Sequence, residues 1–303
     1  MIGLRVALST ALALLLLQTA MNALVIGAAQ ALPGGEIIAF SAQGRTTQDI
    51  YIQDLSAGIV RNITSHIGSS RHETQPAWSP DGRQIVFASS ADTYAPTDLY
   101  VIDMDGRNLR RLTDFPGGEF SPAWSPDGRR IAFVSYRLNN LDISVMDADG
   151  SHVRQLTDSP LIDDSPAWSP DGRQIAFHST RYGVDGSVVD TIYVMDADGS
   201  NERRLIEGYH SPAWSPDGTQ MALLSGWEGH LYVMDVADGK LSSFDITGLQ
   251  SALAWLPESR RIAYVSTRCF CLPEVYVLDM ERGIERRLYY GGVSGYIPAW
   301  RPT

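Results

Sequence analysis

One short motif recurs along the chain at nearly even spacing. The heptapeptide PAWSPDG occupies residues 76–82, 122–128, 166–172 and 212–218, a divergent LAWLPES occupies residues 253–259, and PAW occupies residues 298–300. Successive tryptophans of the motif are 41 to 46 residues apart. A repeat of roughly 40–50 residues that contains several short strands is typical of β-propeller blades. The spacing therefore predicts a ring of repeated sheets.

Each repeat divides into four predicted strands. After the short segment around Trp124 come RIAFVS at residues 130–135, DISVMD at residues 142–147 and VRQLT at residues 153–157, all rich in strand-forming residues. Ser-Pro-Asp-Gly supplies proline and glycine for a tight turn after the first strand, and Asp-Ala-Asp-Gly supplies a second turn after the third strand. No segment between them has helical periodicity. The pattern predicts four-stranded antiparallel blades.

The two ends of the repeat array carry complementary parts of one blade. Residues 36–64 contain IIAFSA, DIYIQD and IVRNIT, which read as second, third and fourth strands, and residues 298–300 read as a first strand. Pairing the two segments completes a sixth blade and removes the open sheet edges that promote aggregation. We therefore predict an all-β fold, a six-bladed propeller over residues 32–303, with the six motif tryptophans in the wedges between blades.

The repeat resembles that of the TolB-like six-bladed propeller family, whose pattern runs close to WSPDG–IAF–S–(D)IYVMDADG–LT. TIYVMDADG at residues 191–199 shows the second half of that pattern. The resemblance covers nearly all of the chain after the first thirty residues or so. TolB carries an α/β domain before its propeller, and prolyl-oligopeptidase-like enzymes attach a hydrolase domain to theirs; we expect neither here. The resemblance implies a fold and a set of uses for it, and it carries over no catalytic residue.

The N-terminal segment is expected to direct export. Arg5, the apolar run at residues 6–17 and the small-x-small sequence at residues 29–31 are typical of a signal peptide that occupies residues 1–31. The apolar stretch continues to Ala29, which is long enough to span a bilayer, so a retained anchor is the alternative. In either case we expect a periplasmic or extracellular propeller that meets the membrane only through this segment.

Net charge limits the class of partner. The chain carries a formal charge of −11 and has a pI near 4.9, which argues against nucleic acid as the main partner. We expect a protein or a cell-envelope component as partner, a monomer, and no cofactor. Cys269 and Cys271 are separated by one residue, so a disulfide between them would be strained. We favour a local structural role for this pair over a metal site.

Two further polar patterns have competing interpretations. The Asp-rich turns at residues 103–106, 147–150 and 196–199 lack the spacing of an EF-hand loop, and we interpret them as hairpin turns. Arginines recur on the predicted outermost strands, at residues 110–111, 154, 203–204 and 286–287. We expect these arginines to charge exposed edges, with a protein-docking role as the alternative.

The two ends of the predicted ring differ in chemistry. One end, here called the turn end, carries the repeated SPDG and DADG turns. The other end, the loop end, carries the second-to-third-strand loops and the connections between blades. These vary in length and sequence, as at residues 91–97, 137–141, 181–189 and 268–273. Loops held on a rigid scaffold carry a large share of binding residues, so we expect function at the loop end.

The candidate binding residues lie around the channel mouth at the loop end. Acidic, aromatic and histidine side chains come just before or at the start of the first strands, and arginines follow the second strands. Ion pairs between these groups across blades are one interpretation, and a polar ligand or metal site is the other. The candidates are Glu73, Glu119, Asp163, Asp164, Tyr209, His210 and Tyr296, together with Arg137, Arg181 and Arg268.

Two classes of function follow. The chain contains no G-x-S-x-G, H-E-x-x-H, P-loop or G-x-G-x-x-G motif. This favours an exported binding module that docks a protein or envelope component over an enzyme. The alternative is a hydrolase or lyase in the channel, with a metal held by Glu73, Glu119, Asp163 and His210. His178 stands where other repeats have aliphatic residues, and we expect it to be a core histidine.

Overall fold

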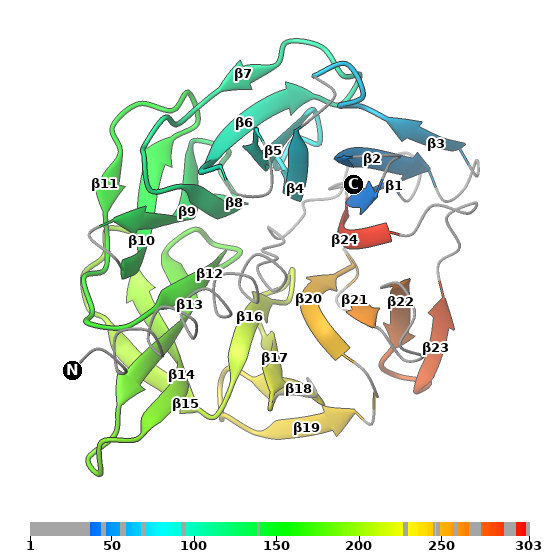
Figure 1. The fold of residues 1–303 in the computed structure, drawn as a ribbon. Helices are drawn as coiled ribbons and strands as arrows, with labels where there is room; N and C mark the ends of the chain where they lie inside the picture. The colour runs from blue at the N-terminus through cyan, green and yellow to red at the C-terminus, as the bar shows by residue number, and fades with distance from the viewer. Residues whose placement is uncertain are drawn as a thin grey trace, which may run out of the picture.

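Six four-stranded antiparallel sheets form a ring, with the first strand of each sheet nearest the centre (Figure 1). This is a computed structural model, and it describes residues 37–43, 47–54, 59–67, 71–91, 95–137, 140–226, 230–244, 246, 249–256, 258, 260–266, 274–287 and 295–300. All regular elements among these residues are strands. The six-bladed propeller predicted from the repeat is therefore confirmed.

The strands of each blade follow one another in sequence, except in blade 1. Blade 1 contains β24 (Gly295–Trp300), β1 (Ile37–Gln43), β2 (Gln48–Asp54) and β3 (Ile59–Asn62); blade 2 contains β4 (His72–Trp78), β5 (Gln84–Ser90), β6 (Thr97–Asp103) and β7 (Arg110–Arg111); blade 3 contains β8 (Glu119–Trp124), β9 (Arg130–Arg137), β10 (Asn140–Asp147) and β11 (Arg154–Gln155). Blade 4 contains β12 (Asp163–Trp168), β13 (Gln174–Tyr182), β14 (Val188–Asp196) and β15 (Arg203–Glu207); blade 5 contains β16 (His210–Trp214), β17 (Gln220–Ser225), β18 (His230–Asp235) and β19 (Leu241–Phe244); blade 6 contains β20 (Leu249–Trp255), β21 (Arg261–Ser266), β22 (Glu274–Asp279) and β23 (Ile284–Arg287).

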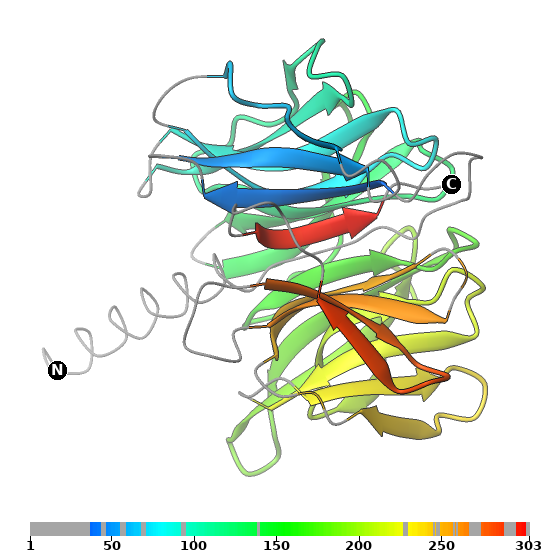
Figure 2. The same cartoon turned by 90° about the vertical axis from the view of Figure 1, so that its right-hand side faces the viewer.

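Strands from distant parts of the sequence close the ring in blade 1. β24 pairs antiparallel with β1, with Ile38 opposite Trp300 and Ala39 opposite Ala299. The two strands lie side by side in the side view (Figure 2). The predicted pairing of the PAW segment with the first described strand is thus confirmed. The expected signal segment and both cysteines lie outside the described residues. No helix among the residues that the structure describes is long and apolar enough to cross a membrane.

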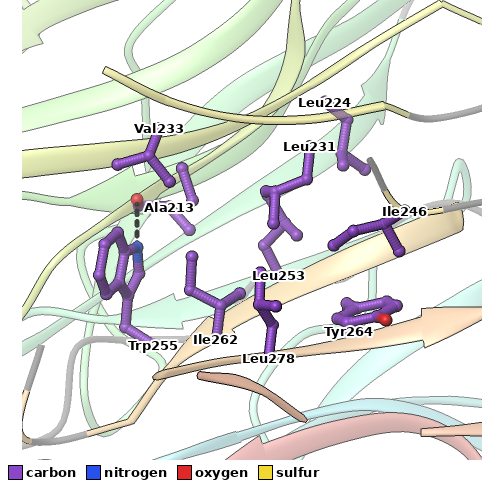
Figure 3. Close-up of a cluster of buried hydrophobic side chains, with 11 residues drawn as sticks. Ala213, Leu224, Leu231, Val233, Ile246, Leu253, Trp255, Ile262, Tyr264 and Leu278 are labelled. Carbon is purple, nitrogen blue, oxygen red and sulfur yellow. Dashed lines mark hydrogen bonds between the residues drawn. The ribbon is translucent and has the colours of Figure 1, made fainter. Parts of the chain in front are cut away.

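Buried side chains fill each wedge between neighbouring blades. Between blades 5 and 6, Trp255 packs among aliphatic side chains, and its Nε1 donates a hydrogen bond to the Ala213 carbonyl oxygen at 3.0 Å (Figure 3). Trp168 donates in the same way to the Ala123 oxygen at 3.1 Å. The indole therefore crosses from its own blade to the preceding one. The tryptophans of blades 2 to 6 are all buried, whereas the side chain of Trp300 lies outside the described part.

Local hydrogen bonds close the turns of the repeat. In blade 3, Ser125 Oγ donates to Asp127 Oδ1 at 2.6 Å and accepts the Arg130 amide at 2.9 Å. Gly128 has φ of +69° and donates its amide to the Ser125 carbonyl at 2.9 Å. The left-handed conformation explains why glycine ends the motif. At the other turn, the Ser151 amide donates to Asp149 Oδ1 at 2.9 Å, so that aspartate has a role within the turn itself.

Arginines on two outer strands connect neighbouring blades. Arg110 Nη1 donates to the Asp149 carbonyl oxygen at 2.6 Å, and Arg154 Nη1 donates to the Asp198 carbonyl oxygen at 2.6 Å. Each arginine thus reaches the Asp-Gly turn of the next blade. The sequence led us to expect these arginines either to charge exposed edges or to dock a protein, and neither expectation included a contact between blades.

A bulge interrupts the first strand in four blades. Gln75, Ser121, Ser165 and Ser211 have φ between +52° and +55°, and each directly precedes a proline. The register of the first strand against the second shifts at the same place. Positive φ is uncommon for a residue other than glycine, and a bulge changes the direction in which the following side chains point. The bulge therefore separates the loop-end residues of each first strand from the tryptophan that fills the wedge.

Candidate functional site

Three of the predicted acidic residues occupy one structural position. Each lies at or near the loop end of a first strand, directly opposite a serine of the second strand. All three carboxylates are buried, with side chains at most 1 % exposed. The pairs are Glu73–Ser89, Glu119–Ser135 and Asp163–Ser179. These acids therefore do not line an open surface as the sequence suggested; they lie inside the ring wall.

An arginine completes each acid–serine pair. In blade 4, Ser179 Oγ donates to Asp163 Oδ1 at 2.5 Å, and Arg181 Nε donates to Ser179 Oγ at 2.6 Å. Arg181 Nη2 lies 3.6 Å from Asp163 Oδ1 and 3.0 Å from Glu202 Oε1. The predicted meeting of arginine and acid thus occurs within one blade. Arg137 donates to Ser135 in the same way at 2.9 Å.

Blade 2 reaches the same arrangement with a different residue. Arg71 precedes the first strand, yet its Nε donates to Ser89 Oγ at 3.1 Å and its Nη2 to the Tyr100 hydroxyl at 2.8 Å. Its guanidinium lies 5.0 Å from the centre of the Tyr100 ring. Arg137 and Arg181 also lie over aromatic rings, at 3.8 and 4.7 Å. Cation–π contacts of this kind hold the three guanidinium groups in place. Arg268 lies outside the described residues.

Burial controls the charge of these acids. Loss of solvent, with a smaller contribution from the charge of Asp49, raises the pKa of Glu73 to about 7. Loss of solvent likewise raises the pKa of Glu119 to about 7, although Thr113 and Ser135 donate hydrogen bonds to it. The pKa of Asp163 is also raised by burial. Each acid therefore takes up a proton at a higher pH than an exposed carboxylate does.

A second polar cluster joins blades 4 and 5. Its centre is His178, which is 8 % exposed and so is the core histidine that the sequence predicted. His178 Nδ1 lies 3.1 Å from Asp164 Oδ1, and Nε2 lies 3.0 Å from Asp190 Oδ1. The ring of His210 lies 6.1 Å away, centre to centre. Asp164 and His210, both predicted, are thus brought together, while Asp190 was missed.

The cluster fixes the charge of its histidine. Burial alone lowers the pKa of His178, but the charge of Asp164 and hydrogen bonds to both carboxylates outweigh it and raise the pKa to about 10. His178 is therefore an imidazolium at neutral pH, with each N–H donated to a carboxylate. Burial and the charge of His178 lower the pKa of His210. His210 Nδ1 contacts Ser211 Oγ at 3.0 Å.

The structure gives a side-chain contact for one of the two predicted tyrosines. Tyr209 packs edge-on against Tyr232, with ring centres 5.2 Å apart. Tyr296 lies on β24 opposite Ser41, and its side chain is outside the described part. Within the part of the chain that the structure describes, no group of three or more His, Cys, Asp or Glu side chains is arranged to hold a metal ion.

At the loop end, the hairpin of blade 4 exposes apolar side chains. β13 and β14 pair as far as Tyr182 and Val188, and these residues are 62 % and 60 % exposed; Val184, between the strands, is fully exposed. The sequence placed a variable loop here but gave no sign that its apolar residues point outward. Exposed carboxylates surround this hairpin and the nearby blade connections: Asp114, Asp158, Asp185, Asp190 and Glu207.

Comparison with known proteins identifies the repeat. Residues 93–208 match the family described as the TolB beta propeller domain. The Tol-Pal system protein TolB of Francisella tularensis subsp. mediasiatica is 28 % identical over 79 residues, which are 26 % of this chain and 18 % of that protein. The chain therefore spans less than a fifth of the length of this relative. Its repeat is a TolB-like propeller repeat.

Solved structures share the whole ring. The crystal structure of TolB from Acinetobacter baumannii has a TM-score of 0.76 at 22 % identity, over 90 % of this chain and 68 % of that one. An oligogalacturonate lyase solved in complex with manganese has a TM-score of 0.58 at 14 % identity, over 83 % of this chain and 73 % of that one. At these identities the likeness concerns the fold, which serves both a Tol-Pal system protein and a lyase.

Proposed function

We propose that this chain with TolB-like repeats is an exported binding module of the cell envelope that docks a partner protein through its loop end. The observation that carries the proposal is the difference between the two ends. At the turn end, the repeated serines, aspartates and glycines satisfy one another through hydrogen bonds. At the loop end, one hairpin presents Tyr182, Val184 and Val188 to solvent. Exposed aromatic and aliphatic residues within a polar surround are typical of an interface.

Charge indicates the chemistry of the partner. Among the exposed carboxylates around the hairpin, Glu207 pairs with Arg204 at 2.8 Å and Asp190 with His178 at 3.0 Å. Asp114, Asp158 and Asp185 are exposed as well, while Arg71, Arg137 and Arg181 are half-buried and engaged with serines and rings. Such a surface attracts a partner that presents lysine or arginine side chains around an apolar centre. Relatives named as Tol-Pal system proteins support an envelope setting for this partner.

A site-specific crosslink tests the docking surface directly. A photoreactive amino acid at Val184 is expected to crosslink one partner in intact cells, whereas the same group at Asp105 on the turn end is expected to give no specific product. The identified partner is then purified and its Kd is measured. A crosslink that forms only from Asp105 would mean that the interface lies at the turn end and would contradict the proposal.

Matched surface variants measure what the hairpin contributes. The triple variant Tyr182→Ser, Val184→Ser, Val188→Ser is expected to weaken binding of the purified partner at least tenfold, since interface anchors often contribute more than about 1.4 kcal/mol. The control is Ile59→Ser with Ile284→Ser, which removes apolar residues of similar exposure from the outer rim. Equal losses from both sets, or loss from the rim set alone, would contradict the proposal.

A channel-site enzyme is the second candidate function. The observation that bears on it is the cluster of Asp164, His178 and Asp190 with His210 nearby, whose side chains are of types that ligate metals, although they are not arranged to hold an ion as they stand. Both nitrogens of His178 already contact carboxylates, so a metal would have to displace one of those contacts. Titration of the purified protein with Mn²⁺ tests this candidate. Stoichiometric binding that is lost in His210→Ala would favour the enzyme over the binding module.

A further inference from the structure

Three successive blade junctions each carry an aspartate of one blade and a buried acid of the next blade at the loop end. The third strand of one blade packs against the first strand of the next: β2 against β4, β6 against β8 and β10 against β12. The aspartate of the third strand and the acid of the next first strand interact electrostatically in every case. The pairs are Asp49 with Glu73, Asp98 with Glu119, and Asp142 with Asp163.

A threonine links the second and third pairs to the backbone of the earlier blade, and Thr64 occupies the same place at the first junction. The amides of Ile50, Leu99 and Ile143 donate to the hydroxyl oxygens of Thr64, Thr113 and Thr157 at 2.8 to 2.9 Å. A hydroxyl that accepts an amide still has its own proton to donate. Thr113 bonds Glu119 and Thr157 bonds Asp163, both across the junction. The amide of one blade is thereby connected to the carboxylate of the next.

The paired acids lack full compensation. Glu119 Oε2 and Asp163 Oδ2 are buried and have no hydrogen-bond partner. The facing cations are few: Arg71 acts on Glu73, Arg137 on Glu119, and Arg181 on both Asp142 and Asp163. Arg111 pairs with Asp98 at 2.9 Å from the solvent side. Two further acids, Asp158 and Glu202, add negative charge near the third junction.

A buried carboxylate that faces a further negative charge ionises only at a high cost in free energy. Burial and then the charge of Asp163 raise the pKa of Asp142 to about 7, as burial does for Glu73 and Glu119. Each junction therefore holds at least one acid that exchanges its proton near neutral pH. These values are above the ordinary carboxylate pKa, so the proton-bound junction is favoured at low pH and is weakened as pH rises through about 7.

The junction between blades 4 and 5 has none of these groups. Thr191, opposite Ser179, takes the place of the third-strand aspartate of the earlier blades. Ile206 takes the place of their threonine, and Tyr209 takes the place of their first-strand acid. The same backbone arrangement is thus present without these carboxylates and this threonine. Its titratable groups are histidines: the pKa of His178 is raised to about 10, so it stays charged near neutral pH, and the pKa of His210 is lowered, so its loss of a proton with rising pH does not weaken the junction. It is an internal control within one ring.

We propose that the junctions from blade 1 to blade 4 form a proton-dependent clasp, in which the buried first-strand acid of each junction holds the loop ends of neighbouring blades together while it carries a proton and loosens them when that proton leaves. The clasp is independent of the identity of any partner. It makes the junctions of blades 1 to 4 weaken as pH rises, an effect that the junction of blades 4 and 5 lacks because it has no acid at the corresponding position.

Hydrogen exchange at the linked amides tests the clasp. Protection factors, corrected for the intrinsic pH dependence of exchange, are measured between pH 5.5 and pH 7 for the amides of Leu99 and Ile143. Release of one proton on opening predicts a fall of about tenfold per pH unit in that range. The amide of Ile192, at the corresponding place in blade 4, is expected to keep its protection.

A neutral isostere separates the clasp from general loosening. In Glu119→Gln the amide of Leu99 is expected to stay equally protected at both pH values, while Ile143 keeps its pH dependence. If this variant does not fold, Glu73→Gln tests the first junction in the same way, with the amide of Ile50 as the readout. Protection that does not change with pH in the wild type, or that falls equally at Ile192, or a Leu99 amide that keeps its pH dependence in the neutral variant, would overturn the proposal.

Discussion

Replacing His178 with leucine, the residue type at the matching place in blade 5, removes the cation that two carboxylates share. Asp164 has only 14 % of its side chain exposed and would lose the cation that faces it, keeping a hydrogen bond with the Ser165 side chain. Removal of one member of a buried ion pair costs about 3–5 kcal/mol. Asp190 is 56 % exposed and can be solvated, so it adds little to this cost. In a ring of this size the loss corresponds to a fall in Tm of roughly 10 °C.

The pH dependence of this loss identifies its cause. The pKa of His178 is raised from 6.5 to about 10, so its contribution is fully present below pH 6.5 and disappears as pH rises through 10. The difference in unfolding free energy between wild type and His178→Leu is therefore expected to be largest near pH 6 and to shrink toward pH 10. Guanidinium unfolding, followed by the fluorescence of the wedge tryptophans, measures the difference at both ends of this range.

Two further variants make the comparison decisive. His152→Leu removes an exposed histidine whose Nδ1 lies 2.7 Å from Asp147 Oδ2, and it is expected to cost far less because solvent screens that pair. The double variant Asp164→Leu, His178→Leu is expected to recover at least half of the loss, since the unpaired buried charge is removed. A cost at His178 as small as that at His152, or a double variant weaker than the single one, would refute the reasoning.

Three other outcomes follow from the fold. Gly150→Ala is expected to lower Tm more than Gly239→Ala, because both have positive φ but only the former would place its Cβ 2.7 Å from a backbone oxygen of the neighbouring blade. Trp255→Phe is expected to destabilise the ring by about 1 kcal/mol more than Trp124→Phe in denaturant titration, because the indole of the former donates a hydrogen bond and that of the latter has no partner. N-terminal sequencing of exported protein is expected to begin at Leu32, and membrane-bound material with an intact N-terminus would show an anchor instead.

The fold could be predicted because the repeat encodes its own turns and wedges. Proline and glycine in SPDG determine where the first strand ends, and the tryptophan before them determines which residue fills the wedge. Even the closure of blade 1 followed from the sequence, since PAW at the end of the array lacked the strands that residues 36–64 supplied. These signals are local and recur in nearly every blade, so each repeat supports the interpretation of the others.

The candidate site was predicted less well because side-chain direction depends on the bulge. A residue such as Ser121 at positive φ interrupts the alternation of the strand, and no simple pattern of polar and apolar residues shows this. Glu119 was therefore expected at an open mouth and is instead buried. Arg71 was missed for a different reason. It makes the contact with the second-strand serine that Arg137 makes in blade 3, but it precedes the first strand of its blade, whereas Arg137 ends the second. Asp190 was missed because the long hairpin of blade 4 has no counterpart in the repeat.

The distribution of charge around the ring separates structural acids from surface acids. Glu73, Glu119 and Asp163 look functional in the sequence because acids are unusual beside a core motif, yet each is enclosed by serine, arginine and the neighbouring blade. The acids that a partner can reach, such as Asp158 and Asp185, are ordinary loop residues in the sequence. Because the buried acids determine how firmly blades 1 to 4 meet, they influence the surface without touching a partner. Substitutions in the two groups should therefore act differently, the buried ones on stability and its pH dependence, and the exposed ones on affinity and its salt dependence.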